Sequence, residues 1–133
     1  MVILSHIRSL FVSPLCMAVA AEPALASRGR LDGKNFDGIV LERGKTSGDA
    51  DTLIFKDGRF RSTACDQYDY GDGPYTSTTS GETVAFEAET ESPKYGKLLW
   101  KGVVRGPRLD ATLTMVRDGR VIGEKWILAG EKN

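Results

Sequence analysis

The sequence predicts an all-β fold, an antiparallel up-and-down meander of about eight strands that closes into a small barrel. From residue 34 onward, apolar and polar residues alternate with the period of two that is typical of strands. Short turn signals interrupt this alternation at nearly regular intervals. No stretch between Lys34 and Gly130 is long enough and periodic enough to predict a helix. The same pattern leaves a β-sandwich as the alternative.

The first four strands are predicted from residues that share one face and from the turns between them. The shared faces are Phe36, Gly38 and Val40, then Leu53 and Phe55, then Phe60, Ser62 and Ala64. Asp57-Gly58 predicts a two-residue hairpin turn, because both central positions tolerate positive φ. Residues 65–74 are irregular, and the threonine-rich residues 75–79 form the fourth strand.

Four further strands follow with the same alternation. Their predicted inner faces are Val84, Phe86 and Ala88, then Leu98, Trp100, Gly102 and Val104, then Leu109, Ala111, Leu113 and Met115, and finally Ile122, Trp126 and Leu128. A second Asp-Gly pair, Asp118-Gly119, predicts the last hairpin turn. Because consecutive strands joined by tight turns pair with their neighbours, a meander is expected.

Residues 1–26 are predicted to be a cleavable signal peptide, and residues 27–133 a single exported domain that is periplasmic or secreted. Arg8 precedes an apolar stretch at 10–21, and Ala24-Leu25-Ala26 has the small-x-small pattern of a signal peptidase site. The apolar stretch is too short to span a bilayer, which needs about 20 residues. The alternative is an N-terminal helix that stays in the fold. Lipid modification of Cys16 is not expected, because Ser13-Pro14-Leu15 lacks the small residues that precede such a cysteine.

Cleavage would leave Cys65 as the one cysteine and would leave no histidine. Histidine is the commonest general base and metal ligand, so Ser-His-Asp, Cys-His and histidine-zinc sites are excluded. Eighteen basic and eighteen acidic residues cancel and are mixed along the chain, so no basic stripe faces nucleic acid. We therefore expect no enzymatic activity, no cofactor, no bound metal and no nucleic-acid partner.

The segment Leu31-Asp32-Gly33-Lys34-Asn35-Phe36-Asp37-Gly38, followed by the meander, resembles the start of the lipocalin-like barrels of the calycin group. In that group a glycine precedes an aromatic residue that plugs the barrel floor, and Phe36 would take that place here. The chain is also similar to small exported bacterial β proteins of unassigned function. The lipocalin resemblance implies that a small apolar molecule binds in the lumen.

The segment at residues 65–75 carries the candidate binding residues. It holds three aspartates and three tyrosines, Asp66, Asp69, Asp72, Tyr68, Tyr70 and Tyr75. Tyrosine supplies rigid amphipathic contact, so these side chains could rim a binding mouth. The alternative is a solvated loop whose tyrosines pack on the barrel end. A calcium site on the aspartates is not favoured, because the ligand order of an EF-hand is absent.

Cys65 has the same strand parity as Arg59 and Arg61, which predicts an outward thiol. Arg61 could lower the pKa of this thiol and make it reactive, or the thiol could pair with another chain. The remaining alternative is an inert thiol that is half-buried at the end of the strand.

Several strands are apolar on both faces. Ile39, Leu41 and Ile127 lie opposite the predicted inner faces, and barrel closure would bring the first and last strands together. Such an outer patch is typical of an association surface.

Two functions follow as hypotheses. The first is a non-enzymatic binder of a small apolar molecule, in the lumen or at the tyrosine-rich loop, and the second is a module that self-associates or docks on an envelope partner.

Overall fold

The structure is a computed structural model that describes residues 30–132. The predicted signal peptide at residues 1–26, with Cys16, lies outside the described residues. Within the described range, no helix has the length and apolar character needed to cross a membrane.

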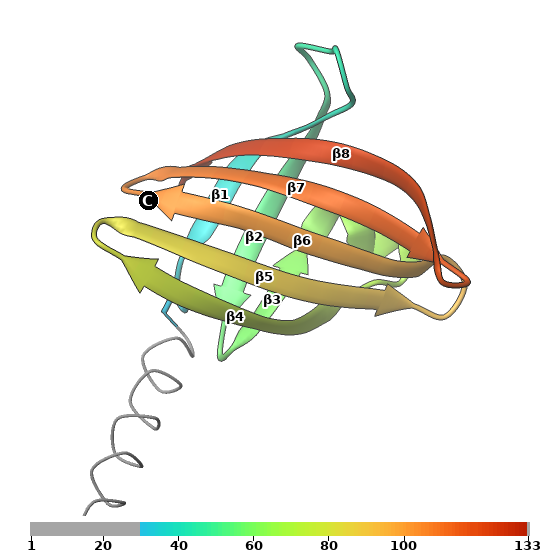
Figure 1. The fold of residues 1–133 in the computed structure, drawn as a ribbon, viewed down its shortest axis with the longest axis horizontal. Coiled ribbons are helices and arrows are strands. Elements are labelled where there is room, and N and C mark those ends of the chain that lie inside the picture. Colours follow the sequence, from blue (N-terminus) through green and yellow to red (C-terminus); the bar gives the residue numbers. More distant parts are fainter. Residues whose placement is uncertain (1–29, 133) are drawn as a thin grey trace, which may run out of the picture.

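Eight antiparallel strands in meander order form a closed barrel, which confirms the predicted fold class (Figure 1). The strands are β1 (Asn35–Leu41), β2 (Asp49–Lys56), β3 (Arg59–Ser62), β4 (Asp72–Ser80), β5 (Thr83–Ser92), β6 (Gly96–Arg105), β7 (Arg108–Arg117) and β8 (Arg120–Glu131). A six-residue 3-10 helix, η3 (Thr63–Tyr68), follows β3. Because β1 pairs with β8, the sheet closes on itself and the sandwich alternative is wrong.

The connections alternate between two ends of the barrel. The open end carries the β1–β2 loop, η3, and the β5–β6 and β7–β8 turns, and the closed end carries the other turns and residues 30–34 (Figure 1). Both Asp-Gly turns have positive φ at their two central residues, 53° and 76° at Asp57 and Gly58, and 52° and 76° at Asp118 and Gly119. The two predicted hairpin turns are therefore confirmed.

Aromatic rings fill the half of the barrel next to the closed end. The ring of Phe55 contacts Phe36, Phe60, Tyr75 and Phe86 at centroid distances of 5.9, 5.1, 5.0 and 5.1 Å. Phe36 is fully buried among these rings. This half of the lumen is therefore a packed core.

The segment before β1 seals the closed end. Leu31 is buried, and its backbone N–H donates to the Tyr75 hydroxyl at 3.0 Å. That hydroxyl donates in turn to Asp32 Oδ1 at 2.7 Å, and the Gly58 N–H donates to the same carboxylate oxygen at 3.0 Å. The contacts tie residues 31 and 32 to β4 and to the β2–β3 turn.

The register between β1 and β8 decides which face of β8 points inward. Val40 faces inward and lies opposite Ile127, while Leu41 lies opposite Trp126. Residues directly opposite each other in an antiparallel pair share a face. Ile127 is accordingly 0% exposed, and Leu128 is 47% exposed. The predicted inner face of β8 is wrong at Trp126 and Leu128, because a strand that is apolar on both sides gives no sign of its orientation. Ile122 lies beyond the register shift at Met115/Val116 and does line the open end of the barrel.

Candidate functional site

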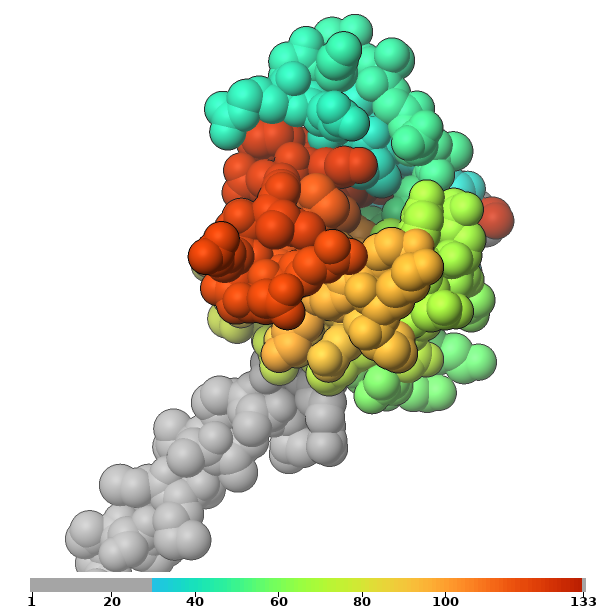
Figure 2. Space-filling model, turned by 90° about the vertical axis from the view of Figure 1, so that its right-hand side faces the viewer, coloured from blue at the N-terminus to red at the C-terminus, as the bar shows by residue number. Residues whose placement is uncertain are grey.

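A pocket with a volume of about 650 Å³ opens at the open end of the barrel. Figure 2 looks onto this end, where the β1–β2 loop, η3 and the two hairpin turns surround a hollow. Small-molecule sites typically have volumes of about 300–1,000 Å³. The hollow therefore has the size of a site for one small ligand.

Apolar side chains from β1, β6 and β7 form the walls and floor of the pocket, namely Val40, Leu98, Trp100, Leu113 and Met115. Trp100 is 1% exposed, and its ring lies 4.8 Å from that of Phe60 in the aromatic core. Its indole N–H donates to the Thr90 hydroxyl at 3.2 Å, so its one polar atom is satisfied within the core. The pocket is thus open at one end only, and its floor is apolar.

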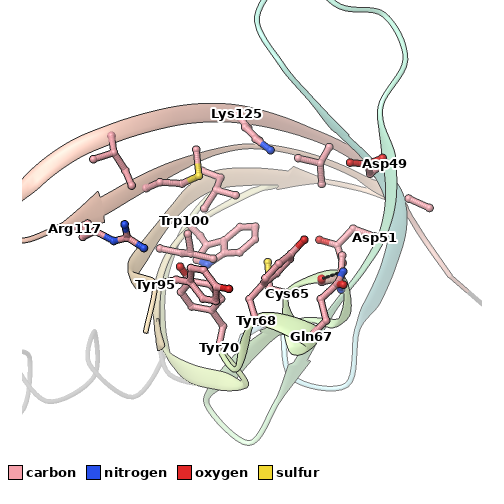
Figure 3. Close-up of a pocket in the computed structure, with 17 residues that line it drawn as sticks. Asp49, Asp51, Cys65, Gln67, Tyr68, Tyr70, Tyr95, Trp100, Arg117 and Lys125 are labelled. Atoms are coloured by element: carbon pink, nitrogen blue, oxygen red, sulfur yellow. Dashed lines mark hydrogen bonds between the residues drawn. The ribbon is translucent and has the colours of Figure 1, made fainter. Parts of the chain in front are cut away.

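Three tyrosines stand at the mouth, Tyr68, Tyr70 and Tyr95 (Figure 3). The rings of Tyr68 and Tyr95 meet edge to face, with 5.5 Å between centroids. Tyr70 packs against the core, and burial raises the pKa of its hydroxyl above the ordinary value. These rings give the mouth apolar faces and hydroxyl groups.

Two basic side chains also line the pocket. Lys125 is half-buried on the inner face of β8, opposite Leu113 of β7, and points into the cavity (Figure 3). Arg117, which is exposed, donates to the Lys94 carbonyl oxygen at 3.4 Å and lies 6.0 Å from the centroid of the Tyr95 ring. Neither Lys125 nor Arg117 forms an ion pair with a carboxylate of residues 30–132.

Buried Asp51 of β2 anchors η3 at the edge of the pocket. Its Oδ2 accepts a hydrogen bond from the Ser62 hydroxyl at 2.5 Å, and its Oδ1 accepts one from the Ala64 N–H at 3.0 Å. The second bond satisfies a backbone donor at the start of η3, which has no partner within the helix. The Asp51 carboxylate is therefore engaged by the protein at both oxygens.

Cys65 lies in η3 and lines the pocket, half-buried. The prediction that it points outward is wrong, because β3 ends at Ser62 and the alternation of a strand no longer applies. Burial raises the pKa of the thiol, against smaller opposing effects of Ser62 and Lys125. The half-buried alternative describes its position.

The three aspartates of the candidate loop do not line the pocket. Asp66 pairs with Arg61, and Asp72 pairs with Arg59 at 2.8 Å. Asp69 takes a left-handed conformation, with φ 67°, just after η3. Among residues 30–132, no three His, Cys, Asp or Glu side chains are grouped as metal ligands would be. Asp66 and Asp72 instead pair with arginines of β3 on either side of the segment that places Tyr68 and Tyr70.

Tyr75 does not join the other tyrosines at the mouth. It lies on the inner face of β4 and is 4% exposed, and its backbone N–H donates to the Gly58 carbonyl oxygen at the closed end. Strand β4 starts at Asp72, earlier than predicted, so the chain has already turned away from the mouth at residue 75. Its predicted place in the binding mouth is wrong.

Sequence reasoning missed Tyr95, Lys125 and Arg117. The signal for Tyr95 is in the meander itself, because the β5–β6 turn and residues 63–71 must share one end of an up-and-down barrel. Lys125 was hidden by the reversed orientation of β8. Arg117 could have been found in the same way as Tyr95, since β7 ends at the open end.

The outer apolar patch exists with different members. Ile39 and Leu41 face outward, as predicted, and lie opposite Leu128 and Trp126. Ile127 is not part of it, because its side chain is in the core. The outer patch is therefore defined as Ile39, Leu41, Trp126 and Leu128, on neighbouring strands β1 and β8.

Comparison with protein-family models, with curated proteins and with solved structures finds no match to this chain. The eight-stranded antiparallel barrel fits a lipocalin-like fold in general. Fold and site together define the class of protein, an up-and-down β-barrel that is packed at one end and opens at the other into an apolar pocket.

Proposed function

We propose that this chain is an exported, non-enzymatic binder of a small and mainly apolar molecule, held in the pocket at the open end. The observation that carries the proposal is the cavity of about 650 Å³ with its apolar floor and tyrosine rim. Aromatic side chains fill the half of the lumen next to the closed end. This supports a site in the other half, where the lumen meets the tyrosine-bearing segment. Lipocalin-like barrels of the calycin group bind ligands in the lumen, which is consistent with this place.

The chemistry of the pocket supports binding over catalysis. Residues 30–132 contain no histidine. The thiol of Cys65 is a nucleophile that lines the pocket. Burial raises the pKa of this thiol, which lowers the fraction of reactive thiolate at neutral pH. Aromatic and aliphatic walls with few polar groups are typical of sites that hold a ligand without reacting with it.

Native mass spectrometry tests the proposal on protein purified from cells of the source organism that express the full chain. We expect a retained small molecule that denaturation releases. Met115→Trp should fill the pocket and abolish retention, since Met115 lines the cavity. The control is Val103→Trp, which adds a large side chain on the outer face of β6. A wild-type protein without a retained molecule, or equal retention by both variants, would contradict the proposal.

Self-association through the outer patch is the second candidate function. The observation in its favour is the adjacency of Ile39 with Leu128 and of Leu41 with Trp126 across the closure of the barrel. Leu128 is 47% exposed, and Ile39, Leu41 and Trp126 are half-buried. Outward apolar groups on neighbouring strands are typical of association surfaces. Sedimentation velocity over a range of concentrations should show a dimer that Leu128→Glu dissociates. A monomer at every concentration would exclude this candidate.

A further inference from the structure

We propose that the ligand is an amphipathic anion, whose apolar body lies on the floor of the pocket and whose carboxylate-like head group binds Lys125, with Arg117 at the rim. This inference rests on the proposed function, because it names the ligand class of the same pocket. The lipocalin resemblance implies a small apolar ligand, and the basic side chains at the mouth add the charged head group.

The surroundings of Lys125 carry the argument. The inward positions nearest to it are apolar, with Leu113 opposite it in β7 and Ile127 next along the inner face of β8. Lys125 is half-buried, so the alkyl part of its side chain can cover such apolar surface while the ammonium group reaches into the cavity (Figure 3). No carboxylate of residues 30–132 pairs with it. A ligand carboxylate would supply the missing partner.

The two acidic side chains that line the pocket, Asp49 and Asp51, both belong to β2. Both oxygens of Asp51 already accept hydrogen bonds from Ser62 and Ala64. Asp49 is exposed, and Figure 3 places both aspartates on the β2 side of the mouth, across the view from Arg117. On β7 and β8, the charged residues that line the pocket are both basic, Arg117 and Lys125. The pocket is therefore polarised toward a ligand whose negative end faces Lys125.

The depth of the pocket limits the apolar body of the ligand. Trp100 closes the bottom, and beyond it Phe60 and the other core rings fill the barrel. A long extended chain cannot pass this floor. Decanoate is thus a suitable probe, with decanol and decylamine as matched probes that differ only in the head group.

Isothermal titration calorimetry with the three probes tests the inference on delipidated protein purified from cells that express the full chain. We expect decanoate to bind tightest. Lys125→Met should weaken decanoate by about tenfold or more, the usual value of a hydrogen bond to a charged group, and leave decanol unchanged. Lys125→Arg should keep the preference for decanoate. The control Lys56→Met removes an exposed lysine at the closed end and should change nothing.

The outcomes separate the inference from the proposed function. Equal binding of decanoate and decanol, or a preference for decylamine, would overturn the anionic head group and leave the binding function in place. Binding of none of the three probes, by a protein that also retains no molecule from its source, would overturn both. Lys125→Glu shows whether weaker decanoate binding results from unfolding. A folded Lys125→Glu protein should bind decylamine more tightly than decanoate, whereas an unfolded protein should bind neither.

Discussion

The Tyr75 hydroxyl donates a 2.7 Å hydrogen bond to Asp32 Oδ1 and accepts one from the backbone N–H of Leu31. Tyr75→Phe removes both bonds and leaves the buried Leu31 N–H without this partner. We expect the variant to lose about 1–3 kcal/mol in the free energy of unfolding, the cost of an unsatisfied buried polar group. Urea denaturation measures the loss. A variant as stable as the wild type would show that the seal does not depend on this hydroxyl.

The same hydroxyl predicts a dependence on alkaline pH. Burial, together with the hydrogen bond to Asp32, raises the pKa of Tyr75 in the folded state above its unfolded value of about 10. Its contribution is therefore fully present below about pH 10 and decreases as the pH rises further, because the unfolded chain deprotonates first. The stability difference between wild type and Tyr75→Phe should shrink between pH 9 and pH 11. A constant difference would contradict this assignment.

Gly38 allows β1 to approach β8 where the barrel closes. A Cβ at this position would lie 2.1 Å from the Leu128 carbonyl oxygen and 2.5 Å from the Ala129 Cβ. Gly38→Ala should therefore destabilise the barrel by about 1–3 kcal/mol, the usual cost of overpacking. Gly130→Ala is the control, because its Cβ would meet only the Pro107 carbonyl oxygen, at 3.9 Å. Thermal melts of the two variants should differ clearly, and equal melting temperatures would argue against a tight closure.

The orientation of β8 can be tested by a pair of neighbouring residues. Ile127 is buried in the core, so Ile127→Ala should cost about 2–5 kcal/mol. Leu128 is 47% exposed, so Leu128→Ala should change stability by no more than about 0.5 kcal/mol. Chemical denaturation gives both values. The reverse order would restore the orientation predicted from the sequence.

Cys65 reports on occupancy of the pocket, which it lines. Because burial raises the pKa of the thiol, alkylation by iodoacetamide at pH 7 should be slower than that of a free cysteine. Decanoate should slow it further by covering the thiol. Mass spectrometry over a time course follows the reaction. Rapid alkylation that decanoate leaves unchanged would place the ligand elsewhere.

The sequence predicted most of the fold, because the relevant signals are local. Alternation and Asp-Gly turns define β5, β6 and β7 and the hairpins at Asp57-Gly58 and Asp118-Gly119. Local signals could not predict the orientation of β8, because it depends on pairing with β1, which is distant in the sequence. The register that sets Val40 opposite Ile127 decides it.

The candidate site was predicted only in part. Tyr68, Tyr70 and Cys65 do line one pocket, and they are close in sequence. Tyr95 and Lys125 come from distant strands, and the barrel brings them together. The acidic residues Asp66 and Asp72 were assigned to the mouth because their arginine partners could not be foreseen. The Arg59–Asp72 pair depends on the register of β3 and β4, and the Arg61–Asp66 pair depends on the 3-10 helix that follows β3.

Tryptophan fluorescence tests the binding pocket most directly, because the two tryptophans lie on opposite faces of the barrel wall. Trp100 forms the pocket floor and Trp126 lies on the outer patch. In Trp126→Phe, titration with decanoate, decanol or decylamine should shift the emission of Trp100 saturably for at least one probe. In Trp100→Phe, the emission of Trp126 should stay unchanged. A response from Trp126 alone, or from neither tryptophan, would contradict ligand binding in the pocket.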